Sequence, residues 1–172
     1  MRHAEAMPRP PASDDHGREL TSRGHADART VGDHLLELGQ VPERVLCSTA
    51  RRTRQTWTGL SEVWSRVGHF PIVQYADTLY GADEDRLLDE LIAVDAGCEH
   101  LMVLAHNPGV HRLALELARA EVTDTRPLER TRERMAPGTA VILEFDQPSW
   151  VGLRRGSGTV IDIVRPQDLA VD

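Results

Sequence analysis

The stretch Leu101-Met102-Val103-Leu104-Ala105-His106-Asn107-Pro108-Gly109 decides the predicted fold. Its first five residues are continuously apolar, as in a parallel strand that is covered on both faces. Asn107-Pro108 is then expected to cap and start a helix, because proline is well tolerated in a first helical turn. A buried strand that leads directly into a helix is the repeating unit of an α/β protein. His106 stands at the junction of the two.

Strand-like and helix-like segments alternate from about Thr21 onward. Apolar residues at steps of three and four indicate helices, with capping residues at Thr21 and Asp83 and a stop at Gly39. The predicted strands are Arg44–Cys47, Ile72–Tyr75, Leu101–Ala105, Ala140–Phe145 and Thr159–Val164. The alternation predicts an α/β fold over residues 1–172, a single domain built as a three-layer sandwich with a mostly parallel central sheet.

Composition excludes several classes of protein. The 172 residues include 20 arginines, no lysine, and 27 aspartates and glutamates, for a net charge of −7. This balance argues against a binder of nucleic acid or anionic membranes, which needs a net positive face. No apolar stretch approaches the ~18 residues that span a bilayer, and the first residues lack the apolar core of a signal peptide. Cys47 and Cys98 are far apart, so we expect a cytoplasmic protein without a disulfide framework or zinc finger.

Polar residues gather at three places that a parallel sheet would bring to one edge: Arg2-His3, Ser48–Thr56 and His106–Gly109. Two histidines and several arginines would then surround one pocket. Guanidinium groups match phosphoryl oxygens in charge and geometry, and a helix start after His106 favours an anion. A neutral imidazole can attack phosphorus. The pattern therefore indicates phosphoryl chemistry.

Four motifs carry a resemblance to a known family. They are Arg2-His3-Ala4, Arg18-Glu19-Leu20-Thr21-x-x-Gly24, Ser48-x-x-x-Arg52-x-x-x-Thr56 and His106-Asn107-Pro108-Gly109. In this order and spacing they resemble the histidine phosphatase superfamily, with its phosphoglycerate-mutase-like fold, and within it the short SixA-type phosphohistidine phosphatases. The resemblance runs from Arg2 to about Pro166. Ala4 follows the SixA-like members, whereas Glu19 stands where that group has proline.

The resemblance implies a role for each matching residue. His3 would be the nucleophile that becomes phosphorylated, and water would then hydrolyse phospho-His3. Arg2 and Arg52 would hold the phosphoryl oxygens, with Arg18 as a further phosphate contact. His106 would donate to these oxygens during transfer. Enzymes of this kind need no metal and no cofactor.

The same residues also have plainer interpretations. His3 could be a disordered terminal residue, and Arg52 could be one surface residue of an arginine-rich helix start. His106 could serve only to close the end of a strand. A metal site formed by His100, His106 and His111 does not fit, since the first precedes the strand and the others do not share a helical face.

The proton donor for the leaving group is the weakest match. The mutase and acid-phosphatase branches carry a glutamate for this purpose in the loop after the Ile72–Tyr75 strand. Here that loop is Asp77–Asp83, and Asp77 is the candidate general acid. A weak acid suits phosphohistidine, whose P–N bond breaks readily once the imidazole is protonated.

The beginning of the sequence departs from the family. Its members normally begin with about five apolar residues, which form the central strand and deliver the Arg-His pair to the pocket. Here only Met1 precedes Arg2. A central strand pairs on both sides, so its absence would leave two neighbours with unmatched backbone groups. We hypothesise that the natural chain starts upstream and that Met1 is the last residue of that strand.

The expected function is that of a metal-independent phosphatase, acting through a phosphohistidine intermediate on phosphohistidine in a protein. Two alternatives stay open. A deep pocket rimmed by the arginine-rich segment Arg126–Arg134 would favour a small phosphorylated metabolite and phosphomonoesterase activity. Intact Arg52 and His106 with a poorly anchored His3 would favour a module that binds phosphorylated partners without turning them over.

Overall fold

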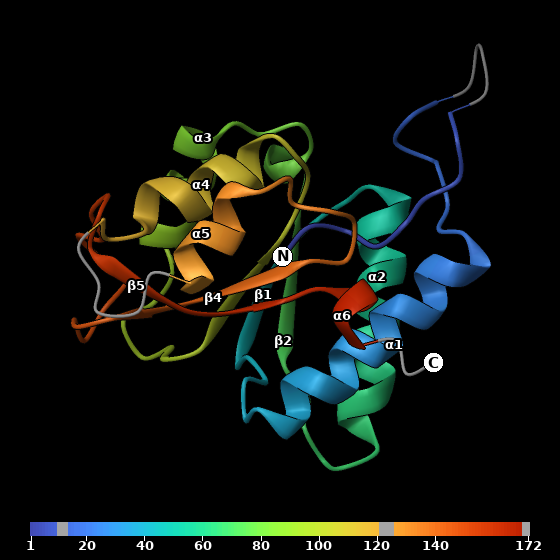
Figure 1. The fold of residues 1–172 in the computed structure, drawn as a ribbon, viewed down its shortest axis with the longest axis horizontal. Coiled ribbons are helices and arrows are strands. Elements are labelled where there is room, and N and C mark those ends of the chain that lie inside the picture. The colour runs from blue at the N-terminus through green and yellow to red at the C-terminus, as the bar shows by residue number, and fades with distance from the viewer. Residues whose placement is uncertain (10–13, 121–125, 170–172) are drawn as a thin grey trace.

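A parallel three-stranded sheet forms the centre of the computed structural model, which describes residues 1–9, 14–120 and 126–169 (Figure 1). Strand β1 (Arg44–Ser48) lies in the middle, between β2 (Ile72–Ala76) and β3 (Leu101–Leu104). Both neighbours run parallel to β1, with Val45 opposite Val73 on one side and Met102 on the other. The α/β class and the parallel pairing predicted from the apolar runs are confirmed.

Helices cover both faces of this sheet (Figure 1). On one side α1 (Ser22–Glu37) packs against α2 (Arg51–Ser65), and on the other α3 (Glu84–Ile92) packs against α4 (Gly109–Leu117). Each side has its own apolar core, one around Trp64 and Leu35 and the other around Leu87 and Leu113. Short helices complete the described chain: η1 (Asp77–Leu79), α5 (Arg126–Arg132) and α6 (Pro166–Leu169).

The last two strands do not join the central sheet. Strands β4 (Ala140–Phe145) and β5 (Gly158–Val164) pair antiparallel with each other as a separate two-stranded sheet. The expectation of one mostly parallel sheet is therefore correct for β1 to β3 only. The physical reason is that a short segment, Met1–His3, is all that bridges β3 and the chain leading into β4.

That segment pairs on both of its sides. Arg2 forms a parallel bridge with Ala105, just beyond β3. On the other side the Arg2 N–H donates to the Thr139 carbonyl at 3.0 Å. These contacts place His3 near the carboxyl ends of the parallel strands, the edge where the sequence predicts the site.

Helix starts follow local side-chain chemistry, with one correction. Thr21 caps α1 by accepting from the Gly24 N–H, and Asp83 caps α3 by accepting from the Arg86 N–H, as predicted. The prediction that Asn107 caps α4 is wrong: Pro108 holds the cap position without a side-chain bond. The Asn107 amide donates instead to the Met135 carbonyl at 3.0 Å, which ties the start of α4 to the chain before β4.

Two motif glycines are explained by close backbone contacts. A Cβ on Gly24 would lie 2.1 Å from the Glu5 carbonyl oxygen, and one on Gly109 would lie 2.0 Å from the Ala82 carbonyl oxygen. Real atoms do not approach so closely, so only glycine lets α1 pack against the N-terminal segment there.

In the part of the chain that the structure describes, no helix is long and apolar enough to cross a membrane.

Candidate active site

The backbone around His3 is held by three different elements. The His3 N–H donates to the Ala105 carbonyl at 3.1 Å, and the Gly138 N–H donates to the His3 carbonyl at 2.9 Å. The next amide, that of Ala4, donates to Thr56 Oγ1 on α2 at 3.0 Å. His3 is only 6 % exposed. The interpretation of His3 as a disordered terminal residue is therefore wrong.

Hydrogen bonds fix which nitrogen of His3 is free to react. Nδ1 lies 2.7 Å from the Ala4 carbonyl oxygen, which can only accept, so Nδ1 carries the proton. Nε2 is then unprotonated and faces the Arg52 Nε–H at 3.3 Å. A lone pair directed at a guanidinium group is the arrangement needed for attack on a phosphoryl group bound by that guanidinium.

His106 lies beside His3, with 5.2 Å between the ring centroids. Its Nε2 is 2.8 Å from Ser48 Oγ, at the end of β1. The Ser48 oxygen also receives the Ala50 N–H at 3.4 Å, so its own proton is available to His106. With Ser48 as the donor, the imidazole proton lies on Nδ1, which is buried and has no partner among the described residues. An N–H in that position is free to donate to a phosphoryl oxygen.

Burial keeps both histidines neutral. The pKa of His3 is lowered to about 4, mainly by burial; the bond to the Ala4 carbonyl opposes this shift, and the charges of Arg52, Arg2 and Arg18 add to it. Burial likewise lowers the pKa of His106 to about 3, with Arg52 as the next cause. A neutral imidazole is the nucleophilic form, so the site holds its histidines in the reactive state at neutral pH.

Arg52 is held in place by Asp15 as well as by its helix. It lies in the first turn of α2 and is 4 % exposed, so it is not one more surface arginine. Its Nη1 donates to the Asp15 carbonyl at 2.6 Å, and its Nη2 donates to the Asp15 carboxylate at 3.0 Å. Tyr80 donates its hydroxyl to the same carboxylate at 2.8 Å and stands edge-on to His106, with 5.5 Å between ring centroids.

The other two predicted arginines, Arg2 and Arg18, are close enough for their charges to lower the pKa of His3. Arg2 donates through Nη1 to the Met135 carbonyl at 2.8 Å, while its buried Nε has no partner among the described residues. Burial lowers the pKa of Arg2, and the charges of Arg134, Arg18 and Arg52 add to that effect. Arg18 forms an ion pair with Asp15 at 3.4 Å. Four guanidinium groups thus concentrate positive charge in an acidic protein.

Asp77 lies at the exposed rim of this region. Its carboxylate accepts from Thr49 Oγ1 at 2.5 Å, and Thr49 in turn lies 3.0 Å from His16 Nε2. The role of Asp77 as a proton donor stays a prediction.

Asp15 and Tyr80 are the two polar residues of the site that our sequence analysis missed. Burial acts to raise the pKa of Asp15, but the Tyr80 hydrogen bond and the charges of Arg52 and Arg18 outweigh it, so this carboxyl stays ionised. The signal in the sequence was weak: Asp15 stands three residues before Arg18. Asp15 and Tyr80 are 65 positions apart in the sequence and meet only in the folded chain.

Metal ligands do not gather in the described part of the chain. Within residues 1–9, 14–120 and 126–169, no group of three or more histidine, cysteine, aspartate or glutamate side chains could hold a metal ion. His111, one of the three histidines considered above, lies instead 2.7 Å from the Thr131 carbonyl through its Nε2.

Comparison with known proteins agrees with this geometry. A protein of Nakamurella multipartitia, described as a candidate phosphohistidine phosphatase SixA, superposes with a TM-score of 0.79 and 31% identity. The match covers 96% of this chain and 93% of that one. The chain belongs to the histidine phosphatase superfamily. A SixA protein histidine phosphatase in complex with tungstate shares the superfamily fold, with a TM-score of 0.76 at 23% identity over 99% of this chain and 97% of that one.

Sequence relatives span the same length. An uncharacterized protein of Mycobacterium tuberculosis is 30% identical over 167 residues, which cover 97% of this chain and all of the relative. No family model matches the chain. Membership in the superfamily therefore rests on the similarity to the Nakamurella multipartitia structure, together with the four motifs.

Thr56→Val tests how the site holds its histidine. Valine keeps the shape but removes the acceptor for the buried Ala4 N–H, which costs about 1–3 kcal/mol when left unpaired. We expect a lower midpoint of urea unfolding and a lower rate of phosphate release. Thr58→Val is the matched control. Like Thr56, Thr58 donates its hydroxyl to the carbonyl four residues earlier in α2 (3.0 Å for Thr58), but Thr58 is exposed. Equal effects of the two substitutions would contradict the anchoring role.

The pKa values of His3 and His106 predict how the protein responds to acid. Both lie below the ordinary histidine value of about 6.5, so the unfolded chain takes up protons before the folded one does. Stability contributed by the neutral rings is therefore full above about pH 6.5 and is lost as the pH falls toward 4. Imidazole ¹⁵N shifts measured at pH 5.5 should show both rings neutral. A His3 resonance that titrates near pH 6.5 would overturn this assignment.

Proposed function

We propose that this protein is a metal-independent phosphatase that uses His3 as its nucleophile and acts on phosphohistidine in proteins. The observation that carries the proposal is the state of His3 Nε2. It is unprotonated, since Nδ1 donates its proton to the Ala4 carbonyl, and it faces Arg52 beside the His106 ring. The superfamily fold supports the reaction class.

The reaction has two steps. In the first, the Nε2 lone pair of His3 forms a bond to phosphorus while the bond from phosphorus to the substrate nitrogen breaks. The substrate ring is protonated on its other nitrogen, so breaking the P–N bond releases it as neutral imidazole. In the second, water attacks phospho-His3, the P–N bond breaks, and phosphate departs with His3 restored. Arg2 and Arg52 stabilise the phosphoryl oxygens, and the His106 Nδ1–H donates to them as charge builds.

The carboxyl groups near the site favour an imidazole leaving group. Asp15 is ionised and paired with Arg52 and Arg18, so it does not supply a proton readily. Asp77 is exposed and bonded to Thr49. An alkyl phosphate would need a stronger acid to release its alkoxide, whereas an imidazole leaves once protonated. This supports phosphohistidine over a phosphomonoester as substrate.

The proposal is tested by phosphate release from a phosphohistidine peptide in excess chelator. We expect steady release by the protein and a loss of at least about 10³-fold in His3→Ala, because no nucleophile remains. His69→Ala is the control, since His69 is exposed and outside the site, and it should keep full activity.

Other outcomes separate the rival functions. Release that continues in His3→Ala would contradict the mechanism. Faster release from a sugar phosphate than from the peptide would move the substrate to small metabolites. Tight binding of the peptide with no release from the unsubstituted chain would indicate a recognition module.

A further inference from the structure

Two aromatic rings, those of Tyr80 and His16, stand on the outer side of the site. The ring centroid of Tyr80 lies 5.5 Å from that of His106, and the guanidinium carbon of Arg52 lies 5.7 Å from the Tyr80 centroid. The His16 ring stands edge-on to Tyr80 at 4.9 Å. Tyr80 is exposed and His16 partly exposed, whereas His106 and Arg52 are buried. A group that extends from a bound phosphoryl group toward solvent therefore passes these two rings.

A chain of hydrogen bonds fixes the position of the proton on the His16 ring. Thr49 donates its hydroxyl to the Asp77 carboxylate at 2.5 Å. The hydroxyl has no second proton, so Thr49 Oγ1 accepts from His16 Nε2, which lies 3.0 Å away. In the neutral ring, Nε2 therefore carries the proton and Nδ1 carries a lone pair. Among the residues that the structure describes, this Nδ1 has no hydrogen-bond partner.

The backbone around His16 is tied to the helix start that carries Arg52. The His16 carbonyl accepts the Arg51 N–H at 3.0 Å, and the Asp15 carbonyl accepts from Arg52 Nη1 at 2.6 Å. The Tyr80 hydroxyl donates to the Asp15 carboxylate at 2.8 Å. Both rings are thus positioned relative to the guanidinium group that is expected to hold the phosphoryl oxygens.

We propose that Tyr80 and His16 form the subsite for the leaving imidazole of the substrate, with His16 Nδ1 as its polar contact. This subsite rests on the proposed function, since the ring that it holds is that of phosphohistidine. The substrate ring, protonated on the nitrogen away from phosphorus, donates that N–H to His16 Nδ1. When His3 attacks, the electron pair of the P–N bond stays on the leaving nitrogen, and the ring departs neutral with its proton. The bond to Nδ1 favours the protonated substrate ring, the form whose P–N bond breaks readily.

Asp77 serves this subsite through Thr49. By accepting the Thr49 hydroxyl proton, it leaves Thr49 Oγ1 as the acceptor for His16 Nε2 and so keeps Nδ1 free to accept. In this arrangement Asp77 is a positioning residue, separated from the substrate ring by a threonine and a histidine.

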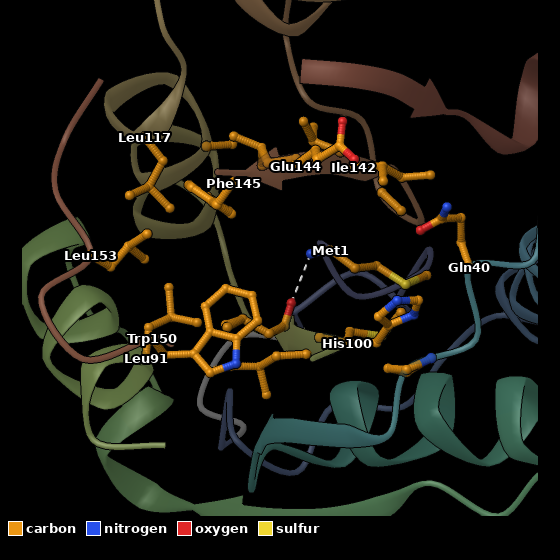
Figure 2. Close-up of a pocket in the computed structure, with 18 of the residues that line it drawn as sticks. Met1, Gln40, Leu91, His100, Leu117, Ile142, Glu144, Phe145, Trp150 and Leu153 are labelled. Carbon is orange, nitrogen blue, oxygen red and sulfur yellow. Dashed lines mark hydrogen bonds between the residues drawn. The ribbon is translucent and has the colours of Figure 1, made fainter. Parts of the chain in front are cut away.

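The cavity between β3 and β4 does not compete for the leaving ring (Figure 2). Its volume is about 540 Å³, and its lining is mainly apolar, with side chains such as Leu91, Phe145 and Trp150. Neither His3 nor His106 lines it. A ring joined by one bond to a phosphoryl group at His3 therefore has its place on the outer side of the site.

The test compares a ligand that carries the ring with one that lacks it. The two ligands are a phosphohistidine peptide and phosphoramidate, which has the P–N bond but no ring. Both are titrated into His3→Ala, so that neither is turned over. We expect the further change His16→Ala to weaken binding of the peptide by at least about tenfold and binding of phosphoramidate by less than about twofold. His69→Ala in the same chain is the matched control and should change neither, because His69 is exposed and outside the site.

A conservative variant isolates the contact at Nδ1. In His16→Asn the side-chain oxygen stands as many bonds from the backbone as Nδ1 does, and it can only accept. It should recover part of the peptide binding that His16→Ala loses. No recovery would overturn the role of Nδ1.

Turnover by the chain with His3 intact tests the role of Asp77. We expect Asp77→Asn to lower kcat/KM for the peptide but not for phosphoramidate. It should have no further effect once His16 is replaced by alanine, because Asp77 acts through that ring. An undiminished effect in the double variant would show that Asp77 acts on the substrate directly, and it would overturn this part of the proposal.

The binding measurements separate failure of the subsite from failure of the phosphatase proposal. Equal losses for the peptide and phosphoramidate, or no loss for either, would overturn the subsite, since a merely structural effect of His16→Ala does not distinguish the ligands. A chain that releases no phosphate from either ligand would overturn the phosphatase proposal, while the difference in binding to His3→Ala would still support a subsite for the ring.

Discussion

The site depends on how the backbone from Arg2 to Ala4 is anchored. This short segment is bonded to Ala105 after β3, to the loop before β4 through Thr139 and Gly138, and to Thr56 on α2. Each bond comes from a different part of the fold, so His3 is positioned only when the sheet, the helix and the loop are all in place. A nucleophile near a chain end would otherwise have the freedom of a terminal residue.

Electrostatics then sets the chemical state of the anchored residues. Burial of the ring and the nearby charges of Arg52, Arg2 and Arg18 lower the pKa of His3, so the ring stays neutral. The same positive charge has a second consequence. It would attract a phosphoryl dianion into a protein whose net charge is −7, and Asp15 balances part of this positive charge.

Much of the fold could be predicted from the sequence because the causes of its helices and strands are local. Thr21 and Asp83 cap their helices with their own side chains, and the apolar run at Leu101 marks a strand covered on both faces. The spacing of the family motif Ser48-x-x-x-Arg52-x-x-x-Thr56 distinguished Arg52 from the other arginines at this helix start. The sequence does not show long-range contacts of polar side chains: Asp15 meets Tyr80 and Arg52 across the fold, and Asn107 bonds to Met135 instead of capping α4.

The central claim is that His3 Nε2 accepts the phosphoryl group, and locating that group after rapid acid-free quenching tests it most directly. The protein would be mixed with a phosphohistidine peptide, quenched in alkali where phosphoramidates survive, and analysed by mass spectrometry and by ³¹P–¹⁵N coupling. The account predicts one phosphoryl group on the peptide that contains His3, bonded to Nε2. A phosphoryl group on Nδ1, on His106 or on any other residue would contradict it.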